Sequence, residues 1–205
     1  MIWFIIATLV AFFIKGLCGF ANTLIFNGIL SYTANNINIS PLEVVLGYPS
    51  NIILVWKERK SLNWKIWLPL TALVVAGSIP GIFLLKHTDA GLLKVIFGIA
   101  VIVIGVEMLF REMKSNRESS NRKPGGSKLV LVLIGIISGL LCGLYGVGAL
   151  LAAYVSRVAE NSHEFKANIC VVFVVENTIR IILYVATGIL TLSVLKQVVI
   201  LIPFM

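Results

Sequence analysis

Long apolar blocks constrain this chain more than any other feature of its sequence. Charged residues are rare or missing in residues 1–14, 67–85, 92–110, 129–141 and 169–186. A helix rises about 1.5 Å per residue, so runs near ~20 residues match the ~30 Å hydrocarbon core of a bilayer. Only 13% of the chain is charged and 59% is apolar, whereas soluble domains are about a quarter charged. The chain is therefore predicted to be an all-α polytopic membrane protein.

Seven apolar segments can be drawn along the chain. They cover residues 2–32, 41–56, 64–85, 90–110, 129–158, 165–186 and 190–205. The one long polar link, 111–128, contains Pro124-Gly125-Gly126, which breaks regular structure. The second segment opens with Ser40-Pro41, which favours a helix start because serine caps the first amides and proline suits the first turn.

The first and fifth segments are too long for one ordinary crossing, and glycine interrupts both. Each has about 30 residues, which as a single helix would measure about 45 Å. The first contains Lys15-Gly-Leu-Cys-Gly-Phe-Ala-Asn22, and the fifth contains Ser138-Gly-Leu-Leu-Cys-Gly-Leu-Tyr-Gly-Val-Gly148. Within them, Leu17-Cys18-Gly19 and Leu141-Cys142-Gly143 lie 124 residues apart. We therefore expect both segments to be broken or re-entrant.

Further matches in the same order indicate two tandem copies of one unit. Asn51 matches Asn177 at a spacing of 126, and Pro69 matches Pro203 at 134. The predicted parts are a first transmembrane repeat in residues 1–111, a polar linker in 112–127 and a second repeat in 128–205. Copy one continues about 40 residues past Pro69, whereas the sequence stops two residues past Pro203. The C-terminal part of the second repeat is therefore expected to be missing.

Two topologies fit the distribution of positive charge. If the first and fifth segments return as hairpins, the copies are inverted, and the links 57–65, 111–128 and 157–166 share one side with 12 Lys/Arg against three. If each segment crosses once, the copies are parallel and the split is 11 to four. Both arrangements follow the positive-inside rule, which places the linker 112–127 in the cytoplasm. The segment lengths and central glycines favour inverted copies.

Glycine breaks deep in the membrane predict an anion-binding site. Non-helical backbone is tolerated there only beside protein or a water-filled cavity. A helix that restarts at such a break points its free N–H groups and its positive end at the midplane. The predicted substrate-binding residues are Gly16, Gly19, Asn22, Asn51, Gly139, Gly143, Gly146, Gly148, Asn177 and Arg180. The alternative for the glycines is close helix packing by small residues.

Charged residues inside the segments give a second signal. Glu176 and Arg180 lie four residues apart in the sixth segment, and intramembrane charge usually marks a functional site. The alternative is an ion pair that only neutralises itself. Lys15, beside the first break, would either attract anions or snorkel to the interface. Glu43 and Glu107 lie near segment ends, where we expect them to be solvated, with a proton relay as the alternative.

No enzyme or cofactor chemistry is indicated by the remaining residues. Cys18, Cys142 and Cys170 lack disulfide or zinc spacing, and the first two are expected to be small packing residues. A membrane-embedded enzyme would need clustered His, Asp or Cys, and the chain has a single Asp, Asp89, in a link. The net charge of +8 comes from short links between apolar blocks, which argues against nucleic-acid binding. No metal and no cofactor are therefore expected.

Residues 137–151, Ile-Ser-Gly-Leu-Leu-Cys-Gly-Leu-Tyr-Gly-Val-Gly-Ala-Leu-Leu, resemble the glycine-rich signature of the TauE/SafE sulfite exporter family. The stretches Phe165-Lys-Ala-Asn168 and Arg180-Ile-Ile-Leu-Tyr-Val-Ala-Thr-Gly-Ile-Leu190 are similar to the family too. The similarity covers nearly the whole chain. The chain departs from the family pattern at Ala149 and at Phe20-Ala21-Asn22, where glycine is usual.

The resemblance implies a bacterial inner-membrane permease that moves sulfite, sulfoacetate or a related organosulfur anion. It places the anion between Gly139–Gly148 and the glycines Gly16 and Gly19. We expect a multi-pass transporter that works by alternating access in the lipid bilayer, with a homodimer as one assembly. A non-transporting assembly or accessory subunit is the alternative, and it predicts that the glycines tolerate substitution.

Overall fold

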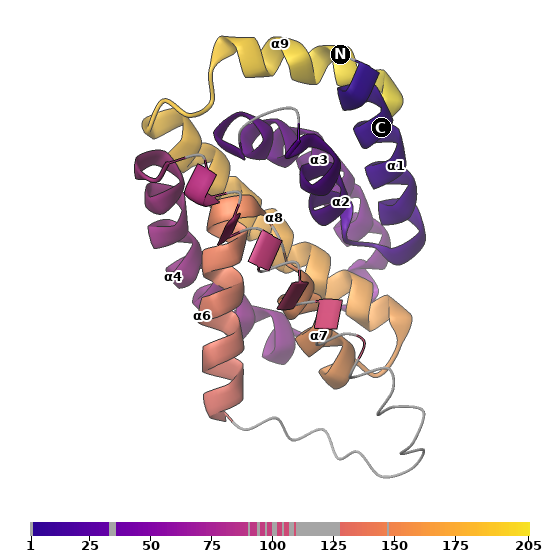
Figure 1. Cartoon of the computed structure of the whole chain (residues 1–205). Helices are drawn as coiled ribbons and strands as arrows, with labels where there is room; N and C mark the ends of the chain where they lie inside the picture. The colour runs from indigo at the N-terminus through magenta and orange to yellow at the C-terminus, as the bar shows by residue number, and fades with distance from the viewer. Residues whose placement is uncertain are drawn as a thin grey trace.

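The computed structural model describes residues 2–32, 36–89, 128–146 and 148–205, together with 91–93, 95–96, 98–99, 102–103, 105–106 and 109. This part of the chain is nearly all-helical and contains no strand (Figure 1). The all-α prediction is confirmed for these residues. The predicted linker 112–127 and Glu107 lie outside the described residues.

The helices are of two kinds, long ones and short ones. The long helices are α3 (Asn36–Glu58), α4 (Trp64–His87), α6 (Lys128–Tyr145) and α8 (Ser162–Ala186). α1 (Ile2–Cys18) is almost as long as α6. The short ones are α2 (Asn22–Leu30), α7 (Ala149–Val158) and α9 (Leu192–Leu201), and the 3-10 turns are η1 (Arg59–Ser61) and η2 (Ile202–Phe204).

α3 begins earlier than the sequence predicted. Its first residue is Asn36, and Pro41 lies inside the helix. Ser40 also lies inside the helix and is therefore not its capping residue. Its Oγ donates a hydrogen bond to the carbonyl oxygen of Leu144, 3.3 Å away. That partner lies 104 positions further along the chain, so a local sequence pattern cannot indicate it.

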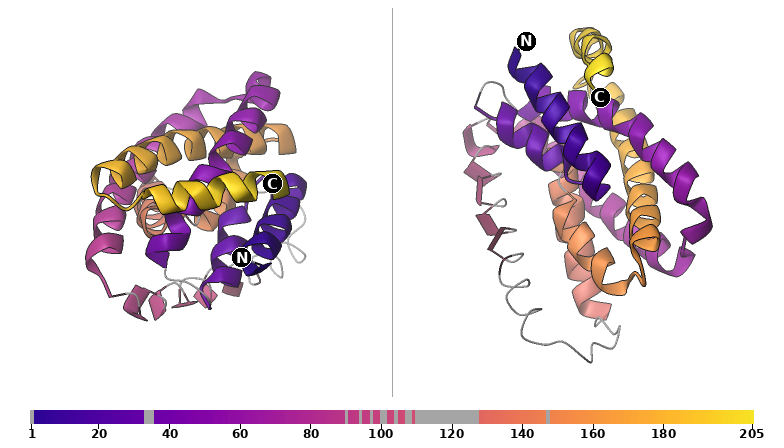
Figure 2. Two further views of the ribbon diagram at one scale, coloured as in Figure 1. Left: turned by 90° about the horizontal axis from the view of Figure 1, so that it is seen from above. Right: turned by 90° about the vertical axis from the view of Figure 1, so that its right-hand side faces the viewer.

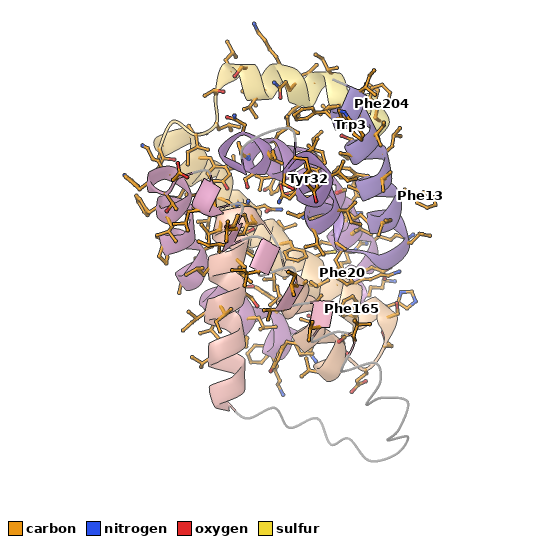
Figure 3. All side chains as sticks on the ribbon, viewed as in Figure 1. Trp3, Phe13, Phe20, Tyr32, Phe165 and Phe204 are labelled. Carbon is orange, nitrogen blue, oxygen red and sulfur yellow. The ribbon has the colours of Figure 1, made fainter. Side chains whose placement is uncertain are left out.

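Three helical stretches among the described residues are long and apolar enough to cross a membrane. They are Asn38–Ser61, which joins α3 to η1, Trp64–His87 and Ser162–Ala186. Large apolar side chains also cover the outside of the molecule. On α1, Trp3 is 58% exposed and Phe13 is 69% exposed, and Figure 3 shows Phe13 pointing away from the bundle. An apolar outer surface of this kind suits contact with lipid rather than water.

Glycines bring α4 and α6 into close contact, and the two helices run in the same direction. Gly77 faces Gly139, and Gly81 faces Gly143 one turn further along both helices. A Cβ added at Gly143 would lie 2.3 Å from the carbonyl oxygen of Ser78. Backbones can approach this closely only where the side chain is missing. Close helix packing therefore explains Gly139 and Gly143.

Polar contacts hold the links of the chain at two ends of the bundle. At one end, Glu58 Oε2 lies 2.9 Å from His163 Nδ1, which joins the end of α3 to the start of α8. At the other, Lys86 Nζ donates to the carbonyl oxygen of Thr187 at 2.9 Å, which joins the end of α4 to the end of α8. α3 and α8 therefore run antiparallel, and α4 runs in the direction of α8.

The two termini lie close together, beside α9 (Figures 1 and 2). Ala7 and Ala11 of α1 belong to one buried cluster with Val194 and Val198 of α9, and residues of α2 and α3 complete it. α1 therefore starts at the end of the bundle where α9 lies. Its last residue, Cys18, lies nearer the opposite end, because the adjacent Gly19 packs against the side chain of Lys166 near the start of α8.

Candidate functional site

Each of the two over-long apolar segments contains two helices separated by a short non-helical stretch. Residues 19–21 separate α1 from α2, and the described residues Gly146 and Gly148 lie between α6 and α7. Gly19 has a φ of 83° and Gly146 has a φ of 72°. Glycine adopts this left-handed conformation readily because it has no Cβ. These two stretches are where the candidate site lies.

A cavity of about 230 Å³ is lined by residues from both non-helical stretches. Its lining consists of Phe20, Ala21, Asn22, Thr23, Leu24, Glu43, Asn51, Gly146, Gly148, Ala149, Phe173 and Asn177. The first turns of α2 and α7 thus both contribute to it. The capping residues of these helices, Ala21 and Gly148, make no side-chain cap hydrogen bond. Because a helix leaves its first N–H groups without intrahelical partners, both starts present donors to the cavity.

The polar wall of the cavity centres on one carboxylate and three asparagines. Asn22 Nδ2 donates to Glu43 Oε1 at 2.6 Å, and Thr23 Oγ1 donates to the same oxygen at 2.5 Å. Asn51 is 3% exposed, and its Oδ1 has no hydrogen-bond partner within the described part of the chain. Asn177 is also buried and lines the same cavity. The site therefore holds two further buried asparagines beside Asn22, and the Asn51 amide oxygen is an acceptor without a described donor.

The expectation that Glu43 is solvated is wrong. α3 begins at Asn36, so Glu43 lies in its interior rather than at its end, and only 4% of its surface is exposed. The two donors that hold its carboxylate come from the first turn of α2. These hydrogen bonds offset the cost of removing the Glu43 carboxyl group from water, so the group can be buried.

Lys15 does not snorkel to the surface. It is 3% exposed, and its Nζ donates to the carbonyl oxygen of Gly47 at 3.2 Å. The same Nζ lies 5.6 Å from the centre of the Phe12 ring. A Cβ added at Gly47 would lie 3.7 Å from Lys15 Nζ and 3.2 Å from Glu43 Oε1, so these two charged groups are near neighbours. Lys15 therefore contributes positive charge to the region around the cavity.

Arg180 lies directly behind the second non-helical stretch. A Cβ added at Gly146 would come within 2.6 Å of Arg180 Nη1, so the glycine leaves room for the guanidinium. Arg180 Nη1 lies 3.9 Å from Glu176 Oε1, and Arg180 Nε donates to the Tyr184 hydroxyl at 2.9 Å. Both members of the charged pair are 1% exposed, and Arg180 Nη2 has no hydrogen-bond partner among the described residues.

The family model described as Sulfite exporter TauE/SafE matches residues 4–205 of this sequence. The chain belongs to the TauE/SafE family. Membership confirms the resemblance and makes the protein a multi-pass membrane transporter of the kind that carries sulfur anions. No curated protein and no solved structure matched the chain.

The structure divides the glycines and polar residues of this TauE/SafE protein into two sets. The predicted residues that line the cavity are Asn22, Asn51, Gly146, Gly148 and Asn177. Those that do not line it are Gly16, Gly19, Gly139, Gly143 and Arg180. A Cβ at Gly16 would meet open space, and one at Gly19 would lie 3.1 Å from Lys166 Cγ. The structure therefore brings one half of the predicted set together.

Sequence reasoning missed several residues of the TauE/SafE cavity. Thr23 and Glu43 supply polar groups, and Phe20 and Phe173 supply aromatic walls. The ring of Phe20 also packs edge-on against Phe165, with ring centres 5.7 Å apart (Figure 3). The one available signal for Glu43 was a carboxylate within an apolar stretch. Because the sequence placed the start of α3 too late, Glu43 was expected near the end of that segment.

Proposed function

We propose that the cavity binds a small anion, sulfite or an organosulfonate such as sulfoacetate, while this TauE/SafE protein carries it across the bacterial inner membrane. The observation that carries the proposal is the meeting of two helix starts, α2 and α7, at one cavity. The dipole of each helix places roughly half a positive charge at its start. Two such starts with uncapped N–H groups favour an anionic ligand.

The side chains around the cavity suit the same class of ligand. Amide groups of Asn22, Asn51 and Asn177 are able to donate hydrogen bonds to sulfite or sulfonate oxygens. Lys15 and Arg180 add buried positive charge close by. The cavity, at about 230 Å³, falls below the roughly 300–1,000 Å³ of pockets for drug-sized ligands. A small anion is therefore a better fit than a bulky one.

Contacts at the ends of the helices support the hairpin topology. The hydrogen-bond contact of Glu58 Oε2 with His163 Nδ1 holds the link after α3 and the link before α8 at one end. The parallel-copy topology would place those links on opposite sides of the membrane. α6, which runs parallel to α4, would then enter from that end, and α7 would return to it. Inverted repeats with interrupted helices at their interface are a common basis of alternating access. We infer that this protein also works by alternating access.

Orientation follows from charge under this topology. The links 57–65, 111–128 and 157–166 carry 12 Lys/Arg and would share one side. The positive-inside rule assigns that side, and with it the linker 112–127, to the cytoplasm. The two repeats, 1–111 and 128–205, would then contribute one interrupted helix pair each to the site.

The experiment is a flux measurement on the full chain in proteoliposomes, with labelled sulfite and labelled sulfoacetate as the two probes. Asn51→Leu removes a cavity amide whose Oδ1 has no partner in the described structure, so folding should be preserved. We expect its flux to fall about tenfold or more, since a hydrogen bond to a charged group contributes roughly 1.5–3 kcal/mol.

Ser138→Ala is the matched control. Ser138 is fully buried, its Oγ likewise has no hydrogen-bond partner among the described residues, and it does not line the cavity. Its flux should equal that of the wild type. Flux of neither anion in the wild type would favour the non-transporting alternative, and normal flux in Asn51→Leu would show that the cavity is not the binding site.

A further inference from the structure

The carboxylate of Glu43 occupies the place that an incoming anion would take at the start of α2. Both side-chain donors of the first turn, Asn22 Nδ2 and Thr23 Oγ1, point at its Oε1. We propose that Glu43 takes up one proton whenever the anion binds in the cavity, so that the anion and the proton cross the membrane together. This inference rests on the proposed function and adds the coupling ion to it.

The geometry makes Glu43 a competitor of the substrate. Its Oε1 accepts from two donors of one helix start, and the residue is 4% exposed and lines the cavity. An ionised carboxylate there would repel a second anion at short range, because charges interact strongly in a site with little water. A protonated Glu43 no longer repels the anion, and its O–H becomes a donor in place of an acceptor.

The balance of buried charge points the same way. Among the residues that the structure describes, the buried charged side chains within the helices around the cavity are Lys15, Glu43, Glu176 and Arg180, two positive and two negative. The further buried carboxylate, Glu164, lies in the first turn of α8, where Asn63 Nδ2 donates to it at 2.9 Å. The site is therefore neutral when empty. A bound monoanion, such as hydrogensulfite, would leave one net negative charge at membrane depth, which is costly, and one proton restores neutrality. A dianion, such as sulfoacetate, would leave two negative charges, and one proton reduces them to one.

Glu43 is the group of this set best placed to take up the proton. Among the described residues, five ionisable groups on neighbouring helices interact electrostatically with Glu43. They are Lys15 of α1, Cys142 of α6, and Glu176, Arg180 and Tyr184 of α8. Glu176 is paired with Arg180 and does not line the cavity. Within the described part of the chain, Glu43 is the one carboxylate in the cavity lining. A proton from water on the loading side would bind to a carboxylate oxygen of Glu43 and leave to water on the opposite side.

The test uses full-length protein in proteoliposomes with no other gradient than pH, and equal potassium with valinomycin holds the membrane potential at zero, since a dianion that crosses with one proton carries net charge. The probe is sulfoacetate or sulfite, whichever the wild type carries. One pH unit corresponds to a tenfold ratio of proton activity, so the wild type should accumulate the anion up to about tenfold on the alkaline side. A pH-sensitive dye inside the vesicles should record proton entry with the anion.

Glu43→Gln separates coupling from transport. Glutamine keeps the size of the side chain and its amide oxygen still accepts from Asn22, but it cannot take up a proton. We expect exchange of labelled for unlabelled anion to be slower than in the wild type, because Glu43 lines the cavity, but still measurable. Accumulation driven by pH should be lost, with an inside-to-outside ratio near one. Glu164→Gln, the same change at a buried glutamate outside the cavity, should accumulate anion as the wild type does.

The measurements distinguish a protein that transports the anion without protons from a protein that does not transport it at all. If wild-type vesicles move the anion but neither accumulate it under a pH gradient nor admit protons with it, coupling is overturned and transport stands. Accumulation by Glu43→Gln equal to the wild type would also overturn the role of Glu43. If neither anion moves under any gradient, the proposed function fails, and the inference fails with it.

Discussion

Ala21, at the turn into α2, holds a backbone conformation that alanine seldom adopts. Its φ is 74°, in the left-handed region where a Cβ crowds the following carbonyl at a cost of roughly 1–2 kcal/mol. We expect Ala21→Gly to raise the free energy of unfolding by about 1 kcal/mol, part of the relief being offset by the extra freedom of glycine in the unfolded chain. Thermal unfolding of the purified protein in detergent measures this.

A matched substitution controls for the general effect of glycine. Ala7 is fully buried in the regular part of α1, where Ala7→Gly should lower the free energy of unfolding by about 1 kcal/mol or more. The same sign for both variants would contradict the assignment of strain to residue 21.

Single residues of the site were predictable only where the chain repeats a pattern. Asn51 and Asn177 were found because they recur at matching positions, and both line the cavity. Glu43 was expected to be solvated, with a proton relay as the alternative, because its burial depends on Asn22 and Thr23, which approach from another helix. The burial of Lys15 likewise depends on a carbonyl of α3, 32 positions away. Such partners leave no trace in a local stretch of sequence.

At the scale of elements, the contact between α4 and α6 depends on glycine. We expect Gly143→Ala to lower the free energy of unfolding by about 1–3 kcal/mol, because its Cβ would lie 2.3 Å from the Ser78 carbonyl oxygen and force the helices apart. Chemical or thermal unfolding followed by circular dichroism would measure the change.

Gly16 offers the matched control for this contact. It also lies in a helix, but a Cβ added there meets nothing within 4 Å. Gly16→Ala should therefore raise stability by up to about 1 kcal/mol, the difference in helix propensity. Equal losses in both variants would mean that the α4–α6 contact is not what Gly143 supports.

Helix existence was largely predictable from the sequence, whereas helix partners were not. Apolar blocks of sufficient length located α4 and α8 within a few residues of their observed bounds. The start of α3 was misplaced because Ser40 bonds to the end of α6 instead of capping its own helix. Glycines at 139, 143, 146 and 148 look alike in the sequence. In the structure, Gly139 and Gly143 face the backbone of α4, whereas Gly146 and Gly148 line the cavity.

At the scale of the whole molecule, the hairpin topology makes a direct prediction about sidedness. In a background where Cys18, Cys142 and Cys170 are replaced by alanine, single cysteines at Lys60 and His163 should react with a membrane-impermeant thiol reagent from the same side. A cysteine at Lys86 should react only from the other side. All three side chains are exposed at the ends of their helices.

The parallel-copy topology gives a different pattern in this experiment. It places residue 60 and residue 163 on opposite faces of the membrane, so labelling of the two from opposite sides would overturn the inverted arrangement. Charge alone could not decide this, because the two topologies differ only by 12 to three against 11 to four. The contact of Glu58 with His163 supports the inverted arrangement, and the labelling pattern tests it.

Two helix starts and the asparagines between them form the proposed anion site, and its occupancy can be measured by calorimetric binding. Titration of the detergent-solubilised wild type with sulfite and with sulfoacetate should give saturable binding of one anion per chain for at least one of them. The double variant Asn51→Leu/Asn177→Leu should bind at least about tenfold more weakly, while Ser138→Ala binds as the wild type does. Equal affinity in the double variant and the wild type would show that the anion does not bind at this cavity.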